Sequence, residues 1–292
     1  MTDGANRVAP WAVVSLTPEI LDRLVRAALE EDVGSRDATT EATVDAAARA
    51  VATLVAKQEL VVAGLDVALH VFRAVSPAIG WEARAREGDR FEPDDLIASV
   101  TGPARAILTG ERVALNFLQR MSGIATLTDR FVRAVLGTKA KIRDTRKTTP
   151  LLRALEKRAV EVGGGVPHRS GLNSGILVKD NHVRLAGSVA EATRRAVAGA
   201  GGLLVEIEVD RPEQIDDALA NGAQMILVDN FTPEQVRAAV AHIAGRVPVE
   251  VSGGVKLDNV RAYAEAGPDY IAVGALTHSA PAADISLEVE PA

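Results

Sequence analysis

The chain has 292 residues, of which 47% are hydrophobic and 25% charged, as in an ordinary globular protein, so a mainly disordered chain is excluded. This length allows one large domain or two smaller ones. The net charge is −6, so the surface as a whole is not predicted to attract the polyanionic backbone of nucleic acid. The absence of cysteine excludes disulfides, thiolate zinc sites and cysteine nucleophiles.

We expect the first segment, residues 1–16, to be an N-terminal tail. It begins Met1-Thr2-Asp3-Gly4, with no basic region ahead of an apolar run, so no secretory signal is predicted. Nowhere does an uninterrupted apolar stretch reach the ~18 residues that a membrane-spanning helix requires. We therefore expect a cytoplasmic protein with no membrane partner.

Residues 17–123 are predicted to form an α+β sandwich domain. Thr17-Pro18-Glu19 combines an N-cap residue, a first-turn proline and a first-turn acid, and helical spacing of apolar residues continues to about Glu31. Short β-branched runs at 51–62 and 96–100, broken by glycine and proline, then predict an antiparallel sheet.

Residues 124–279 are predicted to form a parallel α/β barrel. A long helix from about Ile107 to Leu136 leads into it, because apolar residues repeat there at three- and four-residue spacing. Short apolar strands then alternate with helical patterns at 189–197, 233–243 and 258–266, which is typical of a parallel sheet. Six strands favour an open or incomplete barrel, although a doubly wound sheet has the same alternation. The strands are expected at 141–145, 176–180, 203–209, 224–229, 248–252 and 269–273.

The end of the chain, residues 280–292, is expected to return to the first domain. Residues 285–290 alternate apolar with polar side chains, the pattern of a strand with one buried face. This pattern indicates an edge strand of the N-terminal sheet.

Polar residues or glycine follow each predicted barrel strand. Taken singly, a basic pair is usually a solvated loop, a lysine usually extends to solvent, and a Gly-Gly pair is usually a turn. The carboxyl ends of consecutive parallel strands meet at one rim, however, and reacting groups in barrels come from that rim. The strand-end segments are Asp144-Thr145-Arg146-Lys147-Thr148-Thr149, Lys179-Asp180-Asn181-His182, Glu206 with Glu208, Asp229-Asn230, Ser252-Gly253-Gly254 and Gly274.

These residues divide into three chemical groups. One group is cationic and suits a substrate with several carboxylates or phosphates. A pair of carboxylates suits Mg²⁺ held by few protein ligands and many water or phosphate oxygens. Glycine-rich turns in the last two loops match the usual phosphate position of barrels. The cations are Arg146, Lys147, His168, Arg169 and Lys179; the carboxylates are Glu208 and Asp229; the turn residues are Ser252, Gly253, Gly254 and Gly274.

The ordered motifs of the chain resemble those of the nicotinate-nucleotide pyrophosphorylases, the quinolinate phosphoribosyltransferases. The likeness runs from about residue 17 to the end. Its central string is Asp144-Thr145-Arg146-Lys147-Thr148-Thr149-Pro150, Glu156-Lys157, Gly163-Gly164-Gly165, His168-Arg169, Gly171-Leu172 and Lys179-Asp180-Asn181-His182. Further matches are Glu111-Arg112, Leu118-Gln119-Arg120-Met121-Ser122-Gly123, Glu206-Ile207-Glu208-Val209, Val228-Asp229-Asn230-Phe231, Ser252-Gly253-Gly254 and Gly274-Ala275-Leu276-Thr277-His278-Ser279.

This resemblance implies an α/β sandwich joined to an open α/β barrel, and a homodimer that makes nicotinate mononucleotide for NAD biosynthesis. The substrates would be quinolinate and phosphoribosyl pyrophosphate, and pyrophosphate and carbon dioxide would be released. Arg112 would enter the partner's active site as a quinolinate ligand, and the catalytic residues would be Lys147, Lys179, Glu208 and Asp229. The resemblance implies quinolinate ligands at Arg146, His168, Arg169 and Lys179, a donor ligand at Lys147, magnesium and ribose ligands at Glu208 and Asp229, and phosphate ligands at Ser252, Gly253, Gly254, Gly274 and His278.

The sequence departs from the family pattern at Leu151, Arg158, Pro167 and Ser174, none of which is a proposed ligand. These departures leave open a related phosphoribosyltransferase that acts on another pyridine or azole carboxylate. A barrel lyase with Lys179 as a Schiff-base amine is a second alternative, and it requires an apolar setting for that lysine. A non-catalytic effector-binding protein is a third.

Overall fold

The computed structural model describes Trp11 and residues 16–292, and these residues form two compact units. One unit contains residues 16–129 together with Thr149–Gly164 and Leu276–Ala292. The other contains Arg130–Thr148 and Gly165–Ala275, together with Trp11. The sequence-based boundary between residues 123 and 124 lies inside one continuous helix, α4 (Ala104–Ala134).

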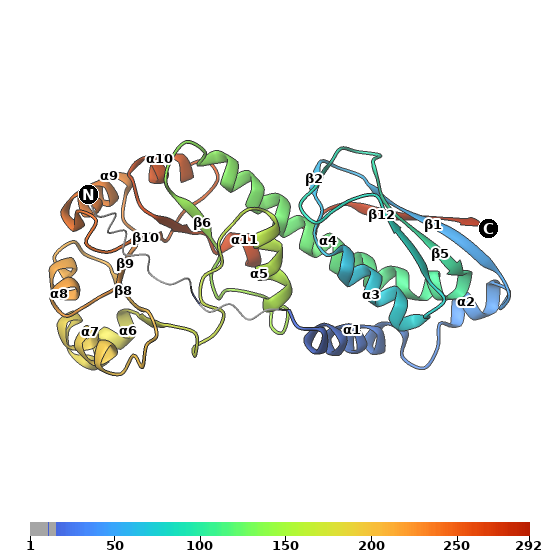
Figure 1. Cartoon of the computed structure of the whole chain (residues 1–292), viewed down its shortest axis with the longest axis horizontal. Helices are drawn as coiled ribbons and strands as arrows, with labels where there is room; N and C mark the ends of the chain where they lie inside the picture. Colours follow the sequence, from blue (N-terminus) through green and yellow to red (C-terminus); the bar gives the residue numbers. More distant parts are fainter. Residues whose placement is uncertain (1–10, 12–15) are drawn as a thin grey trace, which may run out of the picture. The chain divides into compact units, whose positions relative to one another are not determined.

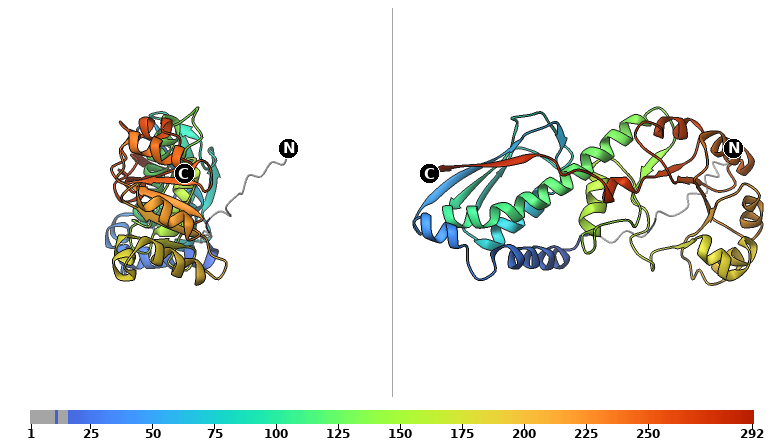
Figure 2. Two further views of the ribbon diagram at one scale, coloured as in Figure 1. Left: turned by 90° about the vertical axis from the view of Figure 1, so that its left-hand side faces the viewer. Right: turned by 180° about the vertical axis from the view of Figure 1, so that it is seen from behind.

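The first unit is built on a four-stranded antiparallel sheet. β1 pairs on one side with β5 and on the other with the last strand of the chain, β12, which lies beside it at the edge of the sheet (Figure 2). A two-stranded ribbon, β2 (Leu60–Val61) with β4 (Arg90–Phe91), accompanies this sheet. The sheet strands are β1 (Arg49–Ala56), β3 (Gly80–Ala83), β5 (Leu96–Pro103) and β12 (Ile285–Pro291), in the order β12-β1-β5-β3.

Helices bury their apolar faces against this sheet to form the core of the first unit. The side-chain oxygen of Thr17 accepts a hydrogen bond from the N–H of Ile20, so the first helix begins at the predicted cap. Phe72 on α3 and Leu118 on α4 are fully buried in the same core as Leu54 of β1. Of the helices in this unit, α1, α3 and α4 contribute buried residues to this core. The helices of the unit are α1 (Pro18–Val33), α2 (Ala38–Thr43), α3 (Leu65–Val75), α4, α5 (Arg153–Val162) and the short α11 (Ala275–His278) (Figure 1).

The second unit is a six-stranded parallel sheet with helices around it (Figure 1). Its order is β6-β11-β10-β9-β8-β7, so the first two strands of this unit, β6 and β7, occupy opposite edges and the barrel is open between them. The strands are β6 (Lys141–Arg143), β7 (Ile176–Val178), β8 (Val205–Val209), β9 (Met225–Asp229), β10 (Val249–Ser252) and β11 (Tyr270–Ala272). The helices are α6 (Asp180–Ala186), α7 (Val189–Ala198), α8 (Gln214–Ala220), α9 (Pro233–Ile243) and α10 (Val260–Glu265).

The predicted α/β class is confirmed, and all six barrel strands lie inside the ranges expected from the sequence. Among the helices, α9 has the predicted bounds because Thr232 and Gln235 form a capping box and a proline occupies the first turn. The helices α3 and α5 were not predicted.

Candidate active site

The carboxyl ends of four neighbouring strands, β7 to β10, bring the predicted carboxylates together with Lys179. Lys179, directly after β7, forms an ion pair with Glu208 of β8. Asp229 ends β9 opposite Ser252 of β10, and the charges of Lys179 and Lys147 both act on its carboxylate. Burial outweighs these lysines and raises the pKa of Asp229. This end of the sheet therefore holds two acids and two lysines within electrostatic range.

Two arginines form the second part of this region. Arg169 is only 6% exposed, and its Nη1 donates to the backbone oxygen of Gly175 at 2.7 Å. Burial, followed by the charge of Arg146, lowers the pKa of Arg169. Among the described residues, no acceptor faces its buried Nε–H. A buried cation with an unused donor beside a second cation is a favourable place for an anionic ligand.

The turn after β10 requires glycine. Gly253 has φ +91°, and a Cβ there would lie 2.2 Å from Oδ1 of Asn230, so the loops after β9 and β10 pack closely. Gly254 also has positive φ, and a Cβ there would meet open space. Phosphate binding by Gly253, Gly254 and Gly274 stays a prediction.

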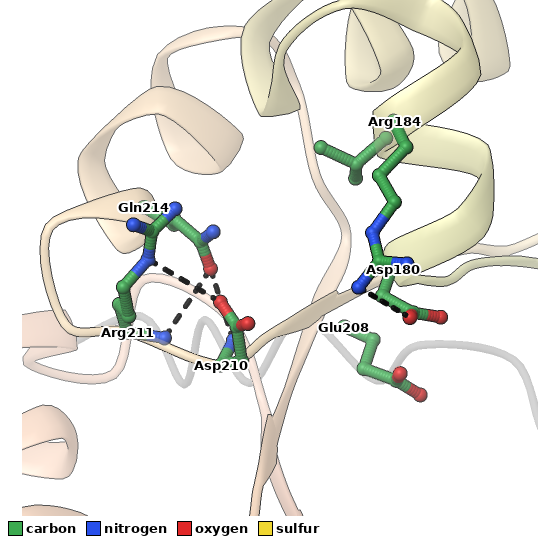
Figure 3. A pocket seen from close by; sticks show the side chains of 7 residues that line it. Asp180, Arg184, Glu208, Asp210, Arg211 and Gln214 are labelled. Carbon is green, nitrogen blue, oxygen red and sulfur yellow. Dashed lines mark hydrogen bonds and ion pairs between the residues drawn. The ribbon is translucent and has the colours of Figure 1, made fainter.

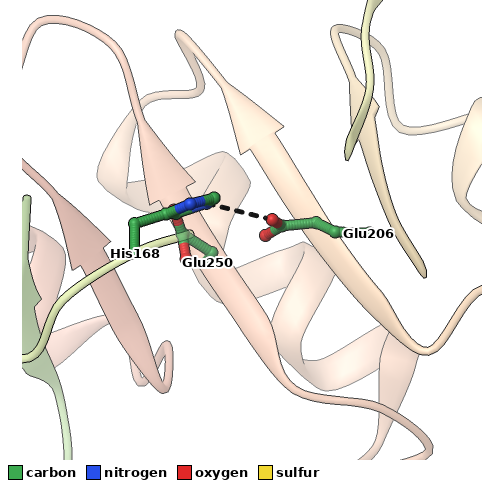
Figure 4. A group of neighbouring side chains, drawn as sticks. All are labelled: His168, Glu206 and Glu250. Atoms are coloured by element: carbon green, nitrogen blue, oxygen red, sulfur yellow. Dashed lines mark hydrogen bonds and ion pairs between the residues drawn. The ribbon is translucent and has the colours of Figure 1, made fainter. Parts of the chain in front are cut away.

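A layer of buried charge lies inside the barrel (Figure 4). Nε2 of His168 is 3.2 Å from Oε2 of Glu206 and 3.5 Å from Oε1 of Glu250. Glu250 also accepts a hydrogen bond of 2.5 Å from Nη1 of Arg143, whose guanidinium lies 3.5 Å from the ring centroid of Tyr270. The His168, Glu206 and Glu250 side chains could form a three-ligand metal site. Arg143 already supplies positive charge to them, so we do not assign the magnesium here.

His168, predicted as one of the cations of the rim, lies buried inside the barrel. The side chain is buried, and Nδ1 accepts a hydrogen bond from the backbone N–H of Arg169 at 2.7 Å. The other ring nitrogen, Nε2, faces the carboxylates of Glu206 and Glu250. Asp144 accepts the backbone N–H of His168 at 2.7 Å, and Trp11 stacks on the ring at a centroid distance of 4.9 Å.

We predict that Glu206 makes folding stability dependent on pH. Burial raises its pKa from the ordinary 4.5 to about 7, so between these values the folded protein keeps a proton that the unfolded chain releases. Glu206 therefore makes its full contribution to the free energy of unfolding below pH 4.5 and loses that contribution as the pH rises to about 7. The difference amounts to about 3 kcal/mol. Glu206→Gln should reduce the loss of unfolding free energy between pH 5 and pH 7.5, measured by urea unfolding in chelator.

Glu265→Gln is the matched control, because Glu265 is an exposed carboxylate paired with Arg261. This variant should keep the pH dependence of the wild-type chain. Parallel curves for Glu206→Gln and the wild type would contradict the assignment.

A small pocket of about 120 Å³ opens beside Glu208 (Figure 3). Arg184 pairs with Asp180 on one wall, and Arg211 pairs with Asp210 on the other. Sequence reasoning assigned no role to these pairs. The pocket is lined by Asp180, Val183, Arg184, Glu208, Asp210, Arg211 and Gln214.

Two predicted site residues belong to the other compact unit. Arg112 is exposed on α4 and forms no hydrogen bond or ion pair with any described residue. His278 ends α11, and its Nδ1 lies 2.6 Å from the hydroxyl oxygen of Ser279. The contacts within each compact unit do not test the roles expected for Arg112 and His278.

Across the described residues, none of the helices combines the length and apolar character needed to cross a membrane.

Two family models match consecutive parts of the chain. The model described as quinolinate phosphoribosyl transferase, C-terminal domain, matches residues 124–288, and the corresponding N-terminal domain model matches residues 37–122. Together they span both compact units.

Curated relatives and solved structures agree with these models. The chain is 48% identical over 271 residues to the nicotinate-nucleotide pyrophosphorylase [carboxylating] of Mycobacterium leprae, covering 91% of this chain and 95% of that protein. It is 40% identical over 270 residues to the probable enzyme of that name from Bacillus subtilis, covering 92% and 93%. The crystal structure of NadC from Streptococcus pyogenes matches with a TM-score of 0.91 and 40% identity, over 96% of this chain and 99% of that one.

Proposed function

Because this chain belongs to the quinolinate phosphoribosyltransferase family, we propose that it transfers the phosphoribosyl group of phosphoribosyl pyrophosphate to the ring nitrogen of quinolinate. The products are nicotinate mononucleotide, pyrophosphate and carbon dioxide, in a step of de novo NAD biosynthesis.

One structural observation carries this proposal beyond the family match. Arg169 is buried beside Arg146 with a donor left over, while Lys179 and Lys147 act on the Asp229 carboxylate at the strand ends. An anionic acceptor and a polyphosphate donor are the ligands that such a set of cations recognises. Quinolinate-dependent release of pyrophosphate from phosphoribosyl pyrophosphate is the direct test, and a non-catalytic effector-binding protein would release none.

The chemistry requires positioning and charge rather than a covalent nucleophile. As the bond from C1 of the ribose to pyrophosphate breaks, positive charge develops on the sugar and negative charge on the leaving group. Lys147 is our candidate for stabilising pyrophosphate, and the acids Glu208 and Asp229 are our candidates for the ribose side. Arg146, Arg169 and Lys179 would hold the pyridine carboxylates.

Decarboxylation follows from alkylation of the ring nitrogen. The cationic pyridinium accepts the electron pair left when the neighbouring carboxylate departs as carbon dioxide, and a proton then forms the new C–H bond. The protein has to hold this ring and exclude water. The buried side chains of His168 and Arg169 are well suited to orient it, since Nδ1 of His168 accepts a backbone N–H and the Arg169 guanidinium donates to a backbone oxygen.

We propose Glu208 and Asp229 as the ligands of Mg²⁺. Both offer carboxylate oxygens at the ends of neighbouring strands. Partial burial raises the pKa of Asp229, so a bound cation would stabilise its ionised carboxylate. The Glu208–Lys179 pair would have to loosen when the ion binds. When bound, magnesium would supply positive charge to the phosphate and ribose oxygens.

Chelation should therefore abolish turnover, and added Mg²⁺ should restore it. We expect Asp229→Asn to lower kcat by about 10²-fold or more and to raise the Mg²⁺ concentration for half-maximal activity. Asp216→Asn is a matched control, because Asp216 is an exposed acid paired with His242. Full activity in a preparation shown to be free of metal would contradict this assignment.

The Schiff-base alternative is not supported by the setting of Lys179. Its side chain is about half exposed and forms an ion pair with Glu208, whereas a Schiff-base lysine requires an apolar site that favours the neutral amine.

We also propose that the active form is a homodimer in which Arg112 completes the neighbouring active site. Its exposed guanidinium, without a partner among the described residues, supports this role. An arginine on the surface of a long helix is available to a second copy of the chain.

A further inference from the structure

One segment of α4 has no part in the proposed chemistry, namely Gln119-Arg120-Met121-Ser122-Gly123. Several of its residues nevertheless form hydrogen bonds to other segments of the chain. Ser122 accepts the backbone N–H of Ala63 at 3.0 Å through its hydroxyl oxygen. Arg120 makes polar contacts with three different residues outside its own helix.

The guanidinium of Arg120 joins α5 to the segment after the barrel. Its Nε and Nη2 donate to Oε1 of Glu156 at 3.1 and 2.7 Å. Its Nη1 donates to the carbonyl of Ala280 at 2.9 Å, and Nη2 also donates to the carbonyl of Thr277. Thr277 directly precedes His278, a proposed phosphate ligand.

Glu156 extends the same network to a second segment. Its side chain is 1% exposed, and its two oxygens accept hydrogen bonds from Thr149: from the backbone N–H at 3.0 Å and from the hydroxyl at 2.8 Å. Thr149 lies two residues after Lys147, the proposed ligand of the donor pyrophosphate. One buried carboxylate therefore fixes the end of the 145–149 segment and the guanidinium that fixes residues 277–280.

Close packing on α4 limits any movement of the second segment. A Cβ on Gly123 would lie 2.0 Å from the carbonyl oxygen of Pro281, so only glycine allows this approach. Gln119 accepts the N–H of Ala283 at 2.9 Å and donates through Nε2 to the carbonyl of Ile285 at 2.7 Å. The chain after His278 is thus held to the helix on which Arg120 stands.

We propose that Arg120 and Glu156 are positioning residues that fix two chain segments, one ending at Thr149 and the other at 277–280, which carry the proposed donor ligands Lys147 and His278. Neither residue touches substrate in this account. The inference rests on the proposed function only for the identity of the donor. Both anchored segments carry a proposed donor ligand, whereas only the first carries a proposed quinolinate ligand, Arg146. Loss of the pair should therefore affect the donor more than the acceptor.

Three variants test the hydrogen-bond network of Arg120 and Glu156, and they differ in the charges that they leave on this pair. Glu156→Gln keeps the shape of the side chain but turns an amide donor toward either the Thr149 N–H or Arg120. Arg120→Lys keeps the charge but cannot reach one carboxylate and two carbonyls at once. The double variant Arg120→Met with Glu156→Leu removes both charges, so no buried carboxylate remains unpaired.

For each variant whose thermal unfolding remains cooperative, we expect the KM for phosphoribosyl pyrophosphate to rise about tenfold and the KM for quinolinate to rise about threefold or less. Inorganic pyrophosphate, titrated by calorimetry, should bind correspondingly more weakly. Arg158→Ala is the matched control: it breaks an ion pair of 2.7 Å to Asp66 from the same helix and should leave both constants within about twofold.

Unchanged KM values and pyrophosphate affinity in a folded double variant would overturn the proposal. An equal rise in both KM values would also overturn it, because general loosening would then explain the result. If quinolinate is not turned over by the wild type, weaker pyrophosphate binding in the variants would still support the positioning role, so the two failures are distinguishable.

Discussion

Mixing two inactive variants, Arg112→Ala and Lys147→Ala, should restore activity. Each homodimer should have lost at least about 10²-fold in kcat, because each of its sites lacks one cation. Subunit exchange produces hybrids in which one site carries both defects and the other carries neither. With complete random exchange, about one quarter of wild-type activity should return. Steady-state rates of the mixture, recorded as exchange proceeds, provide the measurement.

The control is a mixture of Lys147→Ala with Asp229→Asn, two residues placed in the same unit of one chain. That pair should restore nothing, since every hybrid site keeps at least one defect. If exchange is verified by mass spectrometry and the first mixture stays inactive, Arg112 does not act on the partner's site.

Nicotinate should be a poor substrate compared with quinolinate. It lacks the carboxylate next to the ring nitrogen, so binding it would leave buried cationic donors such as the Arg169 Nε–H without an acceptor. Each lost charged hydrogen bond costs about 1–3 kcal/mol, and about 1.4 kcal/mol is a factor of ten. We therefore expect kcat/KM for nicotinate to be lower by more than about tenfold.

Arg169→Ala should raise the KM for quinolinate more than that for phosphoribosyl pyrophosphate. Arg194→Ala is the matched control, because Arg194 is an exposed arginine paired with Glu191 on the outer helix α7. Equal or better turnover of nicotinate by the wild type would remove the need for a site for the second carboxylate. The chain would then be a related phosphoribosyltransferase that acts on another pyridine or azole carboxylate.

The sequence predicted the barrel strands well because each is a short apolar run that ends in polar residues or glycine. It also placed Lys179, Glu208 and Asp229 at neighbouring strand ends, and the parallel register brings them together. These residues could be found because strand order along the chain and at the rim is the same from β7 to β10.

The buried charge layer could not be predicted in the same way. Glu250 lies two residues before Ser252 and so shares its face of β10, but no local pattern shows that its partner is Arg143, which is 107 residues away. The contacts of the His168 ring with the Arg169 N–H and with Glu206 likewise exist only in the folded chain. The alternation of residues along a strand indicates which side chains point inward. It does not indicate which charged groups those side chains contact.

Quinolinate labelled with ¹³C in the carboxylate next to the ring nitrogen tests the decarboxylating phosphoribosyl transfer directly. Incubated with phosphoribosyl pyrophosphate, Mg²⁺ and the protein, it should yield labelled carbon dioxide, unlabelled nicotinate mononucleotide and pyrophosphate in equal amounts. Mass spectrometry and a pyrophosphate assay measure the three products. A product that keeps the label, or no quinolinate-dependent pyrophosphate, would contradict the account.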